Sequence, residues 1–237
     1  MIVVSFTSGS KGGTGKSTLS SLVTLALAGA EVKVLLIDLG QEGNSSRLLL
    51  REPEPPFLRD VLQGKVMLLD AIGSYEIKLE KLGSLNFYMI PNLGPLPKPR
   101  ELEAFFRELK ELENCIDIVF LDLPAYQDPW FNKFIDYSDL VVLVANPFPY
   151  VVNAVINAYT DGKEVIAVLN KFVKGCECYL NLLGKRYKRT IAIAYDPYVA
   201  LLDSANLTKI LEKLSKKFQD GLVGLCFQIA KVGGLCG

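Results

Sequence analysis

Short apolar runs recur along the chain, and most of them are apolar throughout instead of alternating with polar residues. Such runs are typical of strands that are buried on both faces of a parallel sheet. The runs that we interpret as strands cover residues 2–6, 32–39, 85–90, 116–123, 139–147, 164–171 and 191–194. Loops and helical patterns separate them, with few hairpin signals. The pattern predicts an α/β fold: a doubly wound, mostly parallel sheet with helices on both faces.

Helices are predicted where apolar residues recur at three- and four-residue steps. The main segments cover residues 19–30, 57–64, 66–72, 101–112 and 150–158. A last amphipathic helix is predicted over about 206–232, with an apolar face of Leu207, Ile210, Leu211, Leu214, Phe218, Leu222, Leu225 and Ile229. We favour a terminal helix packed on the sheet, because Gly221 and Gly224 weaken a free-standing helix. The alternative is a basic amphipathic helix that binds a membrane surface.

Composition narrows the classes of function. The chain has 237 residues, which fits one domain over residues 1–237. Lys plus Arg and Asp plus Glu both number 26, so a site for nucleic acid or for acidic lipids must be a local patch. Histidine is absent, which excludes His-based acid–base catalysis, Ser-His-Asp triads and His-ligated metals. The five cysteines are scattered, and neither a signal peptide nor a membrane-span pattern is recognised, so we expect a cytoplasmic protein, with association with the nucleoid as an option.

The stretch SGSKGGTGKST, residues 8–18, lies between the first predicted strand and the first predicted helix. Strand, glycine-rich loop and helix together are the context of a phosphate-binding loop. Glycines let the backbone curl with its N–H groups pointing inward, and the helix N-terminus adds partial positive charge. Lys16 is expected to reach the β and γ phosphates of a nucleotide, and the Ser17 hydroxyl to bind Mg²⁺.

The segment KGGTGKST resembles the deviant Walker A motif of the ParA/MinD family of P-loop ATPases, with Ser10 where the usual motif has its first glycine. The resemblance covers roughly residues 1–215 and implies ATP and Mg²⁺ as cofactors and a nucleotide-sandwich homodimer. Lys11 would then touch the phosphates held by the partner subunit; the alternative is a solvated charge beside an anion site. The implied nucleotide contacts are Lys11, Gly12, Gly13, Thr14, Gly15, Lys16, Ser17 and Thr18.

Two carboxylates follow apolar runs and match magnesium-binding positions of the same family. Asp38 matches the first aspartate of the first switch, and Asp122 ends a strand that resembles a Walker B strand. With Ser17 they form the expected metal site, and Lys11, Lys16 and Asp38 are the expected catalytic residues. The second aspartate of this first switch, which relatives use to position the attacking water, is replaced by Gly40, so we expect slow hydrolysis. Glu42 lies two residues on and could compensate in part.

Several other segments carry candidate chemistry. In the related family an asparagine at the position of Asn170 bonds the adenine edge, and Asp196 lies in a segment that covers the base; the alternative for Asn170 is a strand-end turn. Cys176 and Cys178, expected in a loop, could serve a metal or iron–sulfur carrier, but one Cys-x-Cys does not supply four ligands. The proline-rich loop 91–100 reads as the edge of an active site rather than a docking motif.

The densest positive cluster is Lys185, Arg186, Lys188 and Arg189. It could neutralise about four DNA phosphates, although cations at a helix C-terminus before a strand explain it as well. Our leading hypothesis is a ParA-like ATPase that binds DNA non-specifically for plasmid or chromosome partition, helped by a stimulating or adaptor protein. The alternatives are a MinD-like positioning ATPase that binds a membrane through the C-terminal helix and, less favoured, a metal or cluster carrier.

Overall fold

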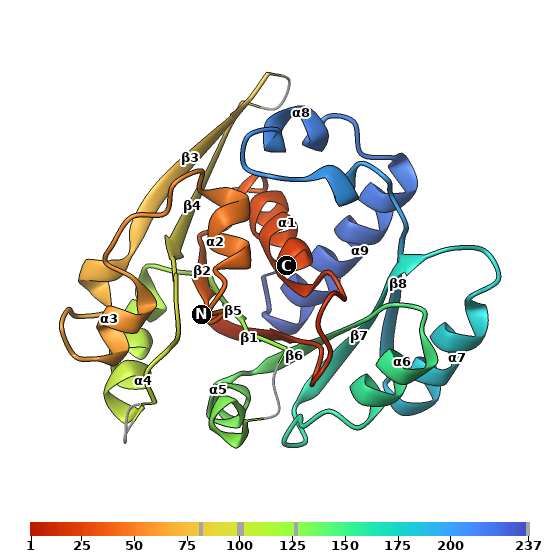
Figure 1. Ribbon diagram of the computed structural model, residues 1–237, viewed down its shortest axis with the longest axis horizontal. Helices are drawn as coiled ribbons and strands as arrows, with labels where there is room; N and C mark the ends of the chain where they lie inside the picture. Colours follow the sequence, from red (N-terminus) through yellow and green to blue (C-terminus); the bar gives the residue numbers. More distant parts are fainter. Residues whose placement is uncertain (81–82, 99–101, 126–127, 236–237) are drawn as a thin grey trace.

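One eight-stranded sheet runs through the protein in the order β3-β4-β2-β5-β1-β6-β7-β8 (Figure 1). The computed structural model describes residues 1–80, 83–98, 102–125 and 128–235. All neighbouring strands pair in parallel except β3 and β4, which form an antiparallel hairpin. The strands are β1 (Ile2–Thr7), β2 (Val34–Asp38), β3 (Gly73–Leu79), β4 (Gly83–Ile90), β5 (Ile118–Asp122), β6 (Leu140–Ala145), β7 (Glu164–Phe172) and β8 (Arg189–Ala194). The predicted fold class is confirmed.

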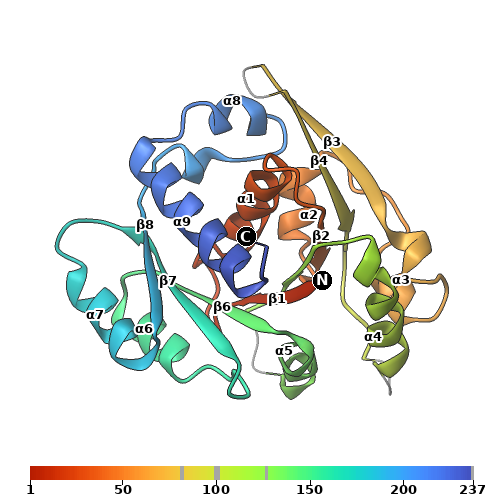
Figure 2. The same cartoon turned by 180° about the vertical axis from the view of Figure 1, so that it is seen from behind.

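Helices cover both faces of this sheet, so the central strands are apolar on both sides (Figures 1 and 2). One face packs against α1 (Lys16–Ala28), α2 (Asn44–Leu49), α8 (Leu207–Leu211) and α9 (Lys216–Val232). The other packs against α3 (Leu58–Leu62), α4 (Glu103–Lys110), α5 (Asn132–Tyr137), α6 (Pro149–Ile156) and α7 (Glu177–Arg186). Short 3₁₀ turns lie at Leu69–Ala71, Glu111–Asn114, Pro129–Phe131 and Val199–Leu201.

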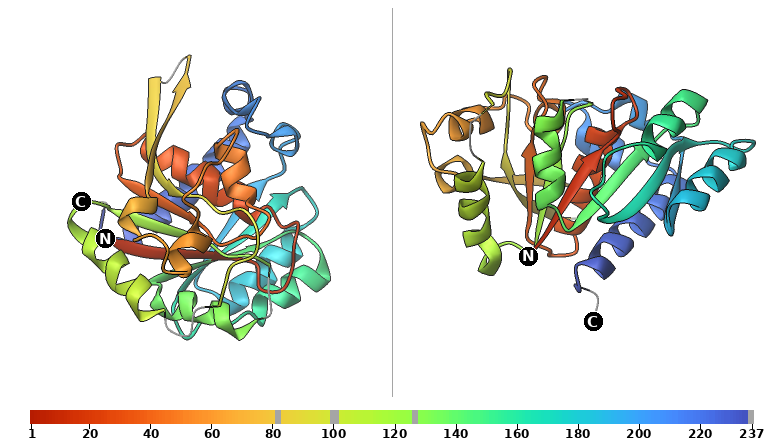
Figure 3. Two further views of the ribbon diagram at one scale, coloured as in Figure 1. Left: turned by 60° about the vertical axis from the view of Figure 1, so that its left-hand side comes forward. Right: turned by 90° about the horizontal axis from the view of Figure 1, so that it is seen from below.

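The hairpin of β3 and β4 extends away from the rest of the sheet (Figure 3, left). The sequence patterns missed β3, because it is an edge strand in which half-buried and exposed residues alternate, so it lacks the apolar run of its neighbours. Helix α2 was also missed, since it begins inside the polar segment 41–46, QEGNSS, which has the composition of a loop. The helix expected over 66–72 is only the 3₁₀ turn Leu69–Ala71. The helix expected over 101–112 corresponds to α4, which begins at Glu103, and to the 3₁₀ turn that follows it; residue 101 lies outside the described residues.

The continuous helix expected over 206–232 is wrong, because the structure has two helices there. Helix α8 ends at Leu211, and α9 starts after Ser215, whose hydroxyl accepts a hydrogen bond from the Phe218 N–H as a helix N-cap. The apolar residues of both helices pack into the core beside α1 and the sheet; Phe218, Leu225 and Ile229 are at most 1% exposed. The favoured interpretation, a terminal helix packed on the sheet, holds. In the described part of the chain, no helix is long and apolar enough to span a membrane.

Candidate functional site

The glycine-rich loop connects β1 to α1 and lies at the carboxyl edge of the sheet, where β5, β6 and β7 also end. It borders a cavity of about 740 Å³. All the predicted loop residues line this cavity: Lys11, Gly12, Gly13, Thr14, Gly15, Lys16, Ser17 and Thr18. Gly15 has a φ of 89°, and a side chain there would collide with the amide of Asn170, so only glycine fits this position. The structure thus builds the predicted loop at one end of one cavity.

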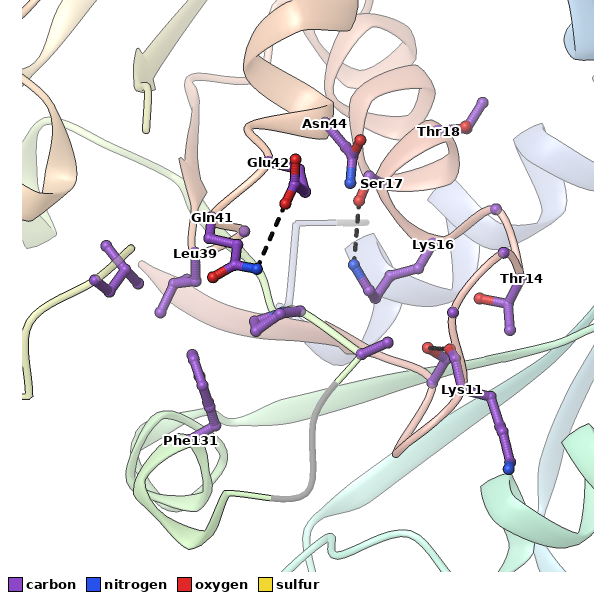
Figure 4. Close-up of a pocket in the computed structure, with 18 of the residues that line it drawn as sticks. Lys11, Thr14, Lys16, Ser17, Thr18, Leu39, Gln41, Glu42, Asn44 and Phe131 are labelled. Carbon is purple, nitrogen blue, oxygen red and sulfur yellow. Dashed lines mark hydrogen bonds between the residues drawn. The ribbon is translucent and has the colours of Figure 1, made fainter. Parts of the chain in front are cut away.

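Lys16 is the buried charge of this cavity. Its side chain is 9% exposed, and its ammonium lies 2.9 Å from Asp122 Oδ1 and 3.1 Å from Ser17 Oγ. The apolar walls of the sheet and α1 leave this ammonium with a carboxylate and a hydroxyl as partners, as a buried charge requires. Figure 4 shows the Lys16 side chain pointing into the cavity toward Ser17. The Lys16 ammonium therefore contacts both the Ser17 hydroxyl and the Asp122 carboxylate.

Asp38 and Asp122 lie next to each other, because β2 and β5 are neighbours and these two residues are in register. Both are at most 1% exposed. Burial, followed by repulsion from Asp122, raises the pKa of Asp38 to about 6, although hydrogen bonds from Ser46 and Gly40 act in the opposite direction. Two carboxylates this close favour a cation between them, and Asp122 already holds the Lys16 ammonium. The pair is therefore suited to a hard cation.

A divalent cation fits the donor set of this edge. Mg²⁺ prefers oxygen ligands and keeps several waters, so a hydroxyl and one or two carboxylates are sufficient protein ligands. Ser17 lines the cavity. Asp122 contacts Lys16 and Asp38 accepts a hydrogen bond from Gly40, two other lining residues, so both carboxylates lie directly behind the lining. When bound, Mg²⁺ would supply charge stabilisation to a phosphate group. These three residues fit the expected metal, and their role stays a prediction.

The first switch segment is held by polar contacts that the sequence did not reveal. Asp38 accepts hydrogen bonds from the Gly40 N–H at 2.8 Å and from Ser46, whose N–H and hydroxyl donate at 2.9 and 2.7 Å. Asn92, fully buried after β4, donates through its amide to the carbonyls of Gly40 and Gly94, and its N–H donates to Ser46 Oγ. The segment around Gly40 is thereby fixed to the start of the 91–98 loop. The presence of serine and asparagine in these segments does not by itself predict hydrogen bonds between residues so far apart in the chain.

The far wall of the cavity comes from two loops. Pro95, Leu96 and Lys98 line it, so the proline-rich segment lies at the edge of this cavity; Pro99 lies outside the described residues. Lys98 pairs with Asp128 of the loop after β5, and Trp130 and Phe131 complete this wall. Gly40 and Glu42 also line the cavity, and the Glu42 carboxylate contacts Gln41 Nε2 at 3.4 Å. The loop from Pro124 to Trp130 matches the position of the family's second switch, and residues 126–127 of this loop are outside the described residues.

Lys11 lies at the front of the loop but does not point into its own cavity. Its ammonium lies 5.7 Å from the ring centre of Tyr150, at the start of α6. Figure 4 shows Lys11 directed away from Lys16, toward α6. Tyr150 is 61% exposed, and its ring stacks on the 50% exposed Phe148. The Lys11 side chain therefore rests on an open aromatic surface at the rim of the cavity.

Asn170 and Asp196 lie outside the lining of the cavity. Asn170 is 5% exposed behind the loop, and its amide donates to the Thr14 carbonyl at 2.8 Å. Asp196 accepts the N–H groups of Tyr198 and Ser215, so it ties the segment after β8 to the start of α9. Burial opposes ionisation of Asp196, but these hydrogen bonds outweigh it and lower its pKa. Contacts of either residue with a nucleotide base stay predictions.

The basic cluster is at the opposite edge of the sheet from the cavity. Lys185 and Arg186 end α7, and Arg189 starts β8 beside the beginning of β7. Arg189 is already engaged, with Nε 2.6 Å from Glu164 Oε1 and a second nitrogen 2.8 Å from Gln228 Oε1. Lys185, Arg186 and Lys188 are exposed. The structure therefore leaves three of the four predicted DNA-contacting cations open to solvent.

The two close cysteines lie at the start of α7, so the expected loop position holds for Cys176 and is wrong for Cys178. Cys176 is the residue before this helix, and Cys178 is in its first turn. Both are free thiols, as are the exposed Cys115 and the buried Cys226; burial raises the pKa of Cys226 to about 12. Across the described residues, no three Cys, Asp or Glu side chains gather as a metal-binding group. A metal or cluster carrier gains no support from this arrangement.

Comparison with known proteins identifies relatives by sequence. A family model described as an AAA domain matches residues 1–174. An uncharacterized ATP-binding protein of Methanocaldococcus jannaschii is 32% identical over 174 residues, which is 72% of this chain and 60% of that protein. The chain thus spans about three fifths of the length of the curated relatives that it matches first.

Solved structures share the fold over nearly the whole chain. The septum site-determining protein MinD of Pyrococcus horikoshii OT3, complexed with Mg-ADP, superposes with a TM-score of 0.76 and 22% identity, covering 99% of this chain and 98% of that one. A ParA family ATPase of Chlorobium tepidum TLS gives a TM-score of 0.68 and 17% identity, with 95% and 98% covered. The family match shows that the chain belongs to the ParA/MinD family of P-loop ATPases, and the two solved structures show that it shares their fold.

Proposed function

We propose that this protein binds Mg-ATP in the cavity beside the glycine-rich loop and uses ATP hydrolysis as a switch. The observation that carries the proposal is the position of Lys16, buried and in contact with Ser17 and Asp122 at the base of that cavity. A triphosphate offers Lys16 stronger partners than one carboxylate oxygen, so its ammonium would move to the phosphates on binding. That movement frees the Ser17 hydroxyl and Asp122 for Mg²⁺ and its waters.

The position of Lys11 supports a dimer formed on ATP. A lysine that bound its own nucleotide would point into the cavity, whereas Lys11 lies over Tyr150 at the rim. Such a lysine is placed to meet phosphates presented by a second copy, as the sequence resemblance implies. The exposed rings of Phe148 and Tyr150 would lie beside that contact. We therefore propose a homodimer in which two cavities face each other.

DNA is the matrix that we favour over a membrane. The apolar face proposed for membrane binding is in the core, since Leu207 of α8 and Leu222 and Ile229 of α9 are buried, so these two helices do not offer that face to lipid. The exposed Lys185, Arg186 and Lys188 remain available for phosphates of a DNA backbone. We propose non-specific DNA binding linked to partition or positioning of a cargo, with an adaptor or stimulating protein that controls release.

Slow turnover follows from Gly40. This residue borders the cavity but has no side chain to orient a water molecule. Phosphoryl transfer depends mostly on positioning and charge, so the loss of a positioning group slows it strongly. Glu42 lines the same cavity and is an exposed carboxylate of the same segment. The proposed protein therefore persists in its ATP-bound form until a partner acts.

Retention of nucleotide and of DNA tests the proposal. Fluorescent ATP with Mg²⁺ should bind wild-type protein, and Lys16→Ala should weaken this binding at least a hundredfold, whereas Lys174→Ala, an exposed lysine beyond β7, should not. DNA titrations with ATP, with ADP and at raised salt then test the switch. DNA binding that ignores both nucleotide and salt would refute the DNA proposal, and equal nucleotide retention by Lys16→Ala would refute the nucleotide site.

A further inference from the structure

Strand β7 contains an irregularity at the point where it passes the glycine-rich loop. Leu169 pairs with Ala192 of β8 and Phe172 pairs with Ala194, so β7 has one more residue between these two pairs than β8 has. That is the geometry of a β-bulge, which bends a strand and redirects its side chains. Asn170 and Lys171 are the β7 residues between these two pairs, and both lie directly behind the loop.

Both residues of the bulge contact the same loop. The Asn170 amide donates to the Thr14 carbonyl at 2.8 Å, and the Lys171 ammonium donates to the Gly13 carbonyl at 3.2 Å. In a regular strand, consecutive side chains point to opposite faces of the sheet and do not reach one target. The bulge is therefore what allows two neighbouring side chains to hold two neighbouring carbonyls.

Lys171 adopts a backbone conformation that is unfavourable for its residue type. Its φ is 56°, in the left-handed region, where a residue with a Cβ is strained. Such strain persists where the surrounding structure enforces it, and it concentrates at functional sites. Asn or Gly would occupy this conformation at lower cost. A lysine at this position indicates that its side chain is needed there.

The two contacts fix the direction of the loop peptides. In a trans peptide, the carbonyl and the N–H of the following residue point in opposite directions. Because the Gly13 and Thr14 carbonyls are held toward β7, the N–H groups of Thr14 and Gly15 point away from β7. Thr14 and Gly15 line the cavity. Their N–H groups are the donors that a phosphate needs in an anion-binding loop.

We propose that the β7 bulge is a clamp that holds the glycine-rich loop in its phosphate-binding shape, with Lys171 as a positioning residue for anion binding. The proposal rests on the proposed nucleotide site. Lys171 acts through the Gly13 carbonyl and touches no phosphate itself. Its side chain is exposed, so the contact stabilises the loop without closing the cavity. Asn170 supplies the second, buried point of the clamp.

Lys171→Asn is the variant that separates positioning from folding. Asparagine tolerates the left-handed conformation, so the bulge should stay while the ammonium is lost. We expect inorganic pyrophosphate and Mg-ADP to bind about fivefold to tenfold more weakly than to wild-type protein. Lys171→Arg should restore most of the affinity, because arginine keeps a charged donor. Urea unfolding of Lys171→Asn should show equal or greater stability than wild type, since the strain is relieved.

Lys174→Asn is the matched control, because Lys174 is an exposed lysine three residues further on with the same charge. Its affinity for pyrophosphate should stay within twofold of wild type, which rules out a general effect of lost charge. Nitrogen-15 relaxation of nucleotide-free protein should show more motion of the Thr14 and Gly15 amides in Lys171→Asn. Unchanged pyrophosphate affinity together with unchanged amide motion would overturn the clamp. If wild type bound neither pyrophosphate nor nucleotide, the proposed function would fail, while the amide motions would still decide on the clamp.

Discussion

The carboxyl edge and the amino edge of the sheet both carry charged residues, but they hold them differently. At the carboxyl edge, Lys16, Asp38 and Asp122 are buried, and each has partners at hydrogen-bond distance. At the amino edge, Lys185 and Lys188 extend into solvent. The energy of a buried charge changes strongly when one partner is lost or one ion binds. Exposed charges contribute little each, so their effect depends on how many there are, and salt screens it. The first arrangement suits a small, highly charged ligand, and the second suits a long polyanion.

Gly40→Asp should produce the largest change at the carboxyl edge. If the residue corresponds to the missing switch aspartate, ATP turnover should rise on the order of 100-fold. A Cβ at Gly40 would lie 3.1 Å from Asp38 Oδ1, so any side chain requires a small local shift. Gly40→Ala carries the same steric cost without a carboxylate and is the control. Phosphate release at saturating Mg-ATP measures both; equal rates for Gly40→Asp, Gly40→Ala and wild type would contradict the assignment.

The buried carboxyl of Asp38 gives an effect of intermediate size on stability. Its folded pKa of about 6 is above the ordinary aspartate value of 3.8, so the folded protein binds a proton more tightly than the unfolded chain. Relative to Asp38→Asn, metal-free wild type should therefore lose stability as pH rises from about 4 to 6, by about 1–3 kcal/mol, and change little above that. Urea unfolding in the presence of a chelator measures the difference.

Ser46→Ala sharpens the same measurement. The Ser46 hydroxyl donates to Asp38 at 2.7 Å and favours the ionised form, so its loss should extend the pH window upward. If the difference in unfolding free energy between wild type and Asp38→Asn did not change between pH 4 and 6, burial would not raise the pKa of this carboxyl. That result would also remove the contrast between buried and exposed charge on which the two-edge comparison depends.

The amino edge should respond more weakly and in a salt-dependent way. Replacing Lys185, Arg186 and Lys188 together with alanine should weaken DNA binding about tenfold near 0.15 M salt and reduce the salt slope by about 2 to 3. The control removes three exposed lysines near the C-terminus, Lys209, Lys213 and Lys216. Fluorescence anisotropy at several salt concentrations measures the slope. If both triple variants lost the same slope, the cluster would have no special role.

Local patterns predicted most of what lies along single segments. The glycine-rich loop, the central strands and the carboxylates at their ends were found because short apolar runs and motif spacing are local properties. Strand β3 escaped because its half-buried and exposed residues alternate and form no apolar run. The break between α8 and α9 escaped because Ser215 is one polar residue inside a continuing helical pattern. Asn92 and Lys171 escaped because their partners are far away in the chain.

The sequence by itself determined the fold class and the residues of the glycine-rich loop, because buried parallel strands and a glycine-Lys-Ser turn leave strong local patterns. Only the tertiary structure decided that Lys16 rests on Asp122, that Lys11 turns outward to Tyr150, and that a bulge in β7 holds the loop from behind. It also placed the apolar face of α9 in the core instead of on the surface. The physical reason is that burial and long-range hydrogen bonds arise only when distant segments pack together, and no single segment records them.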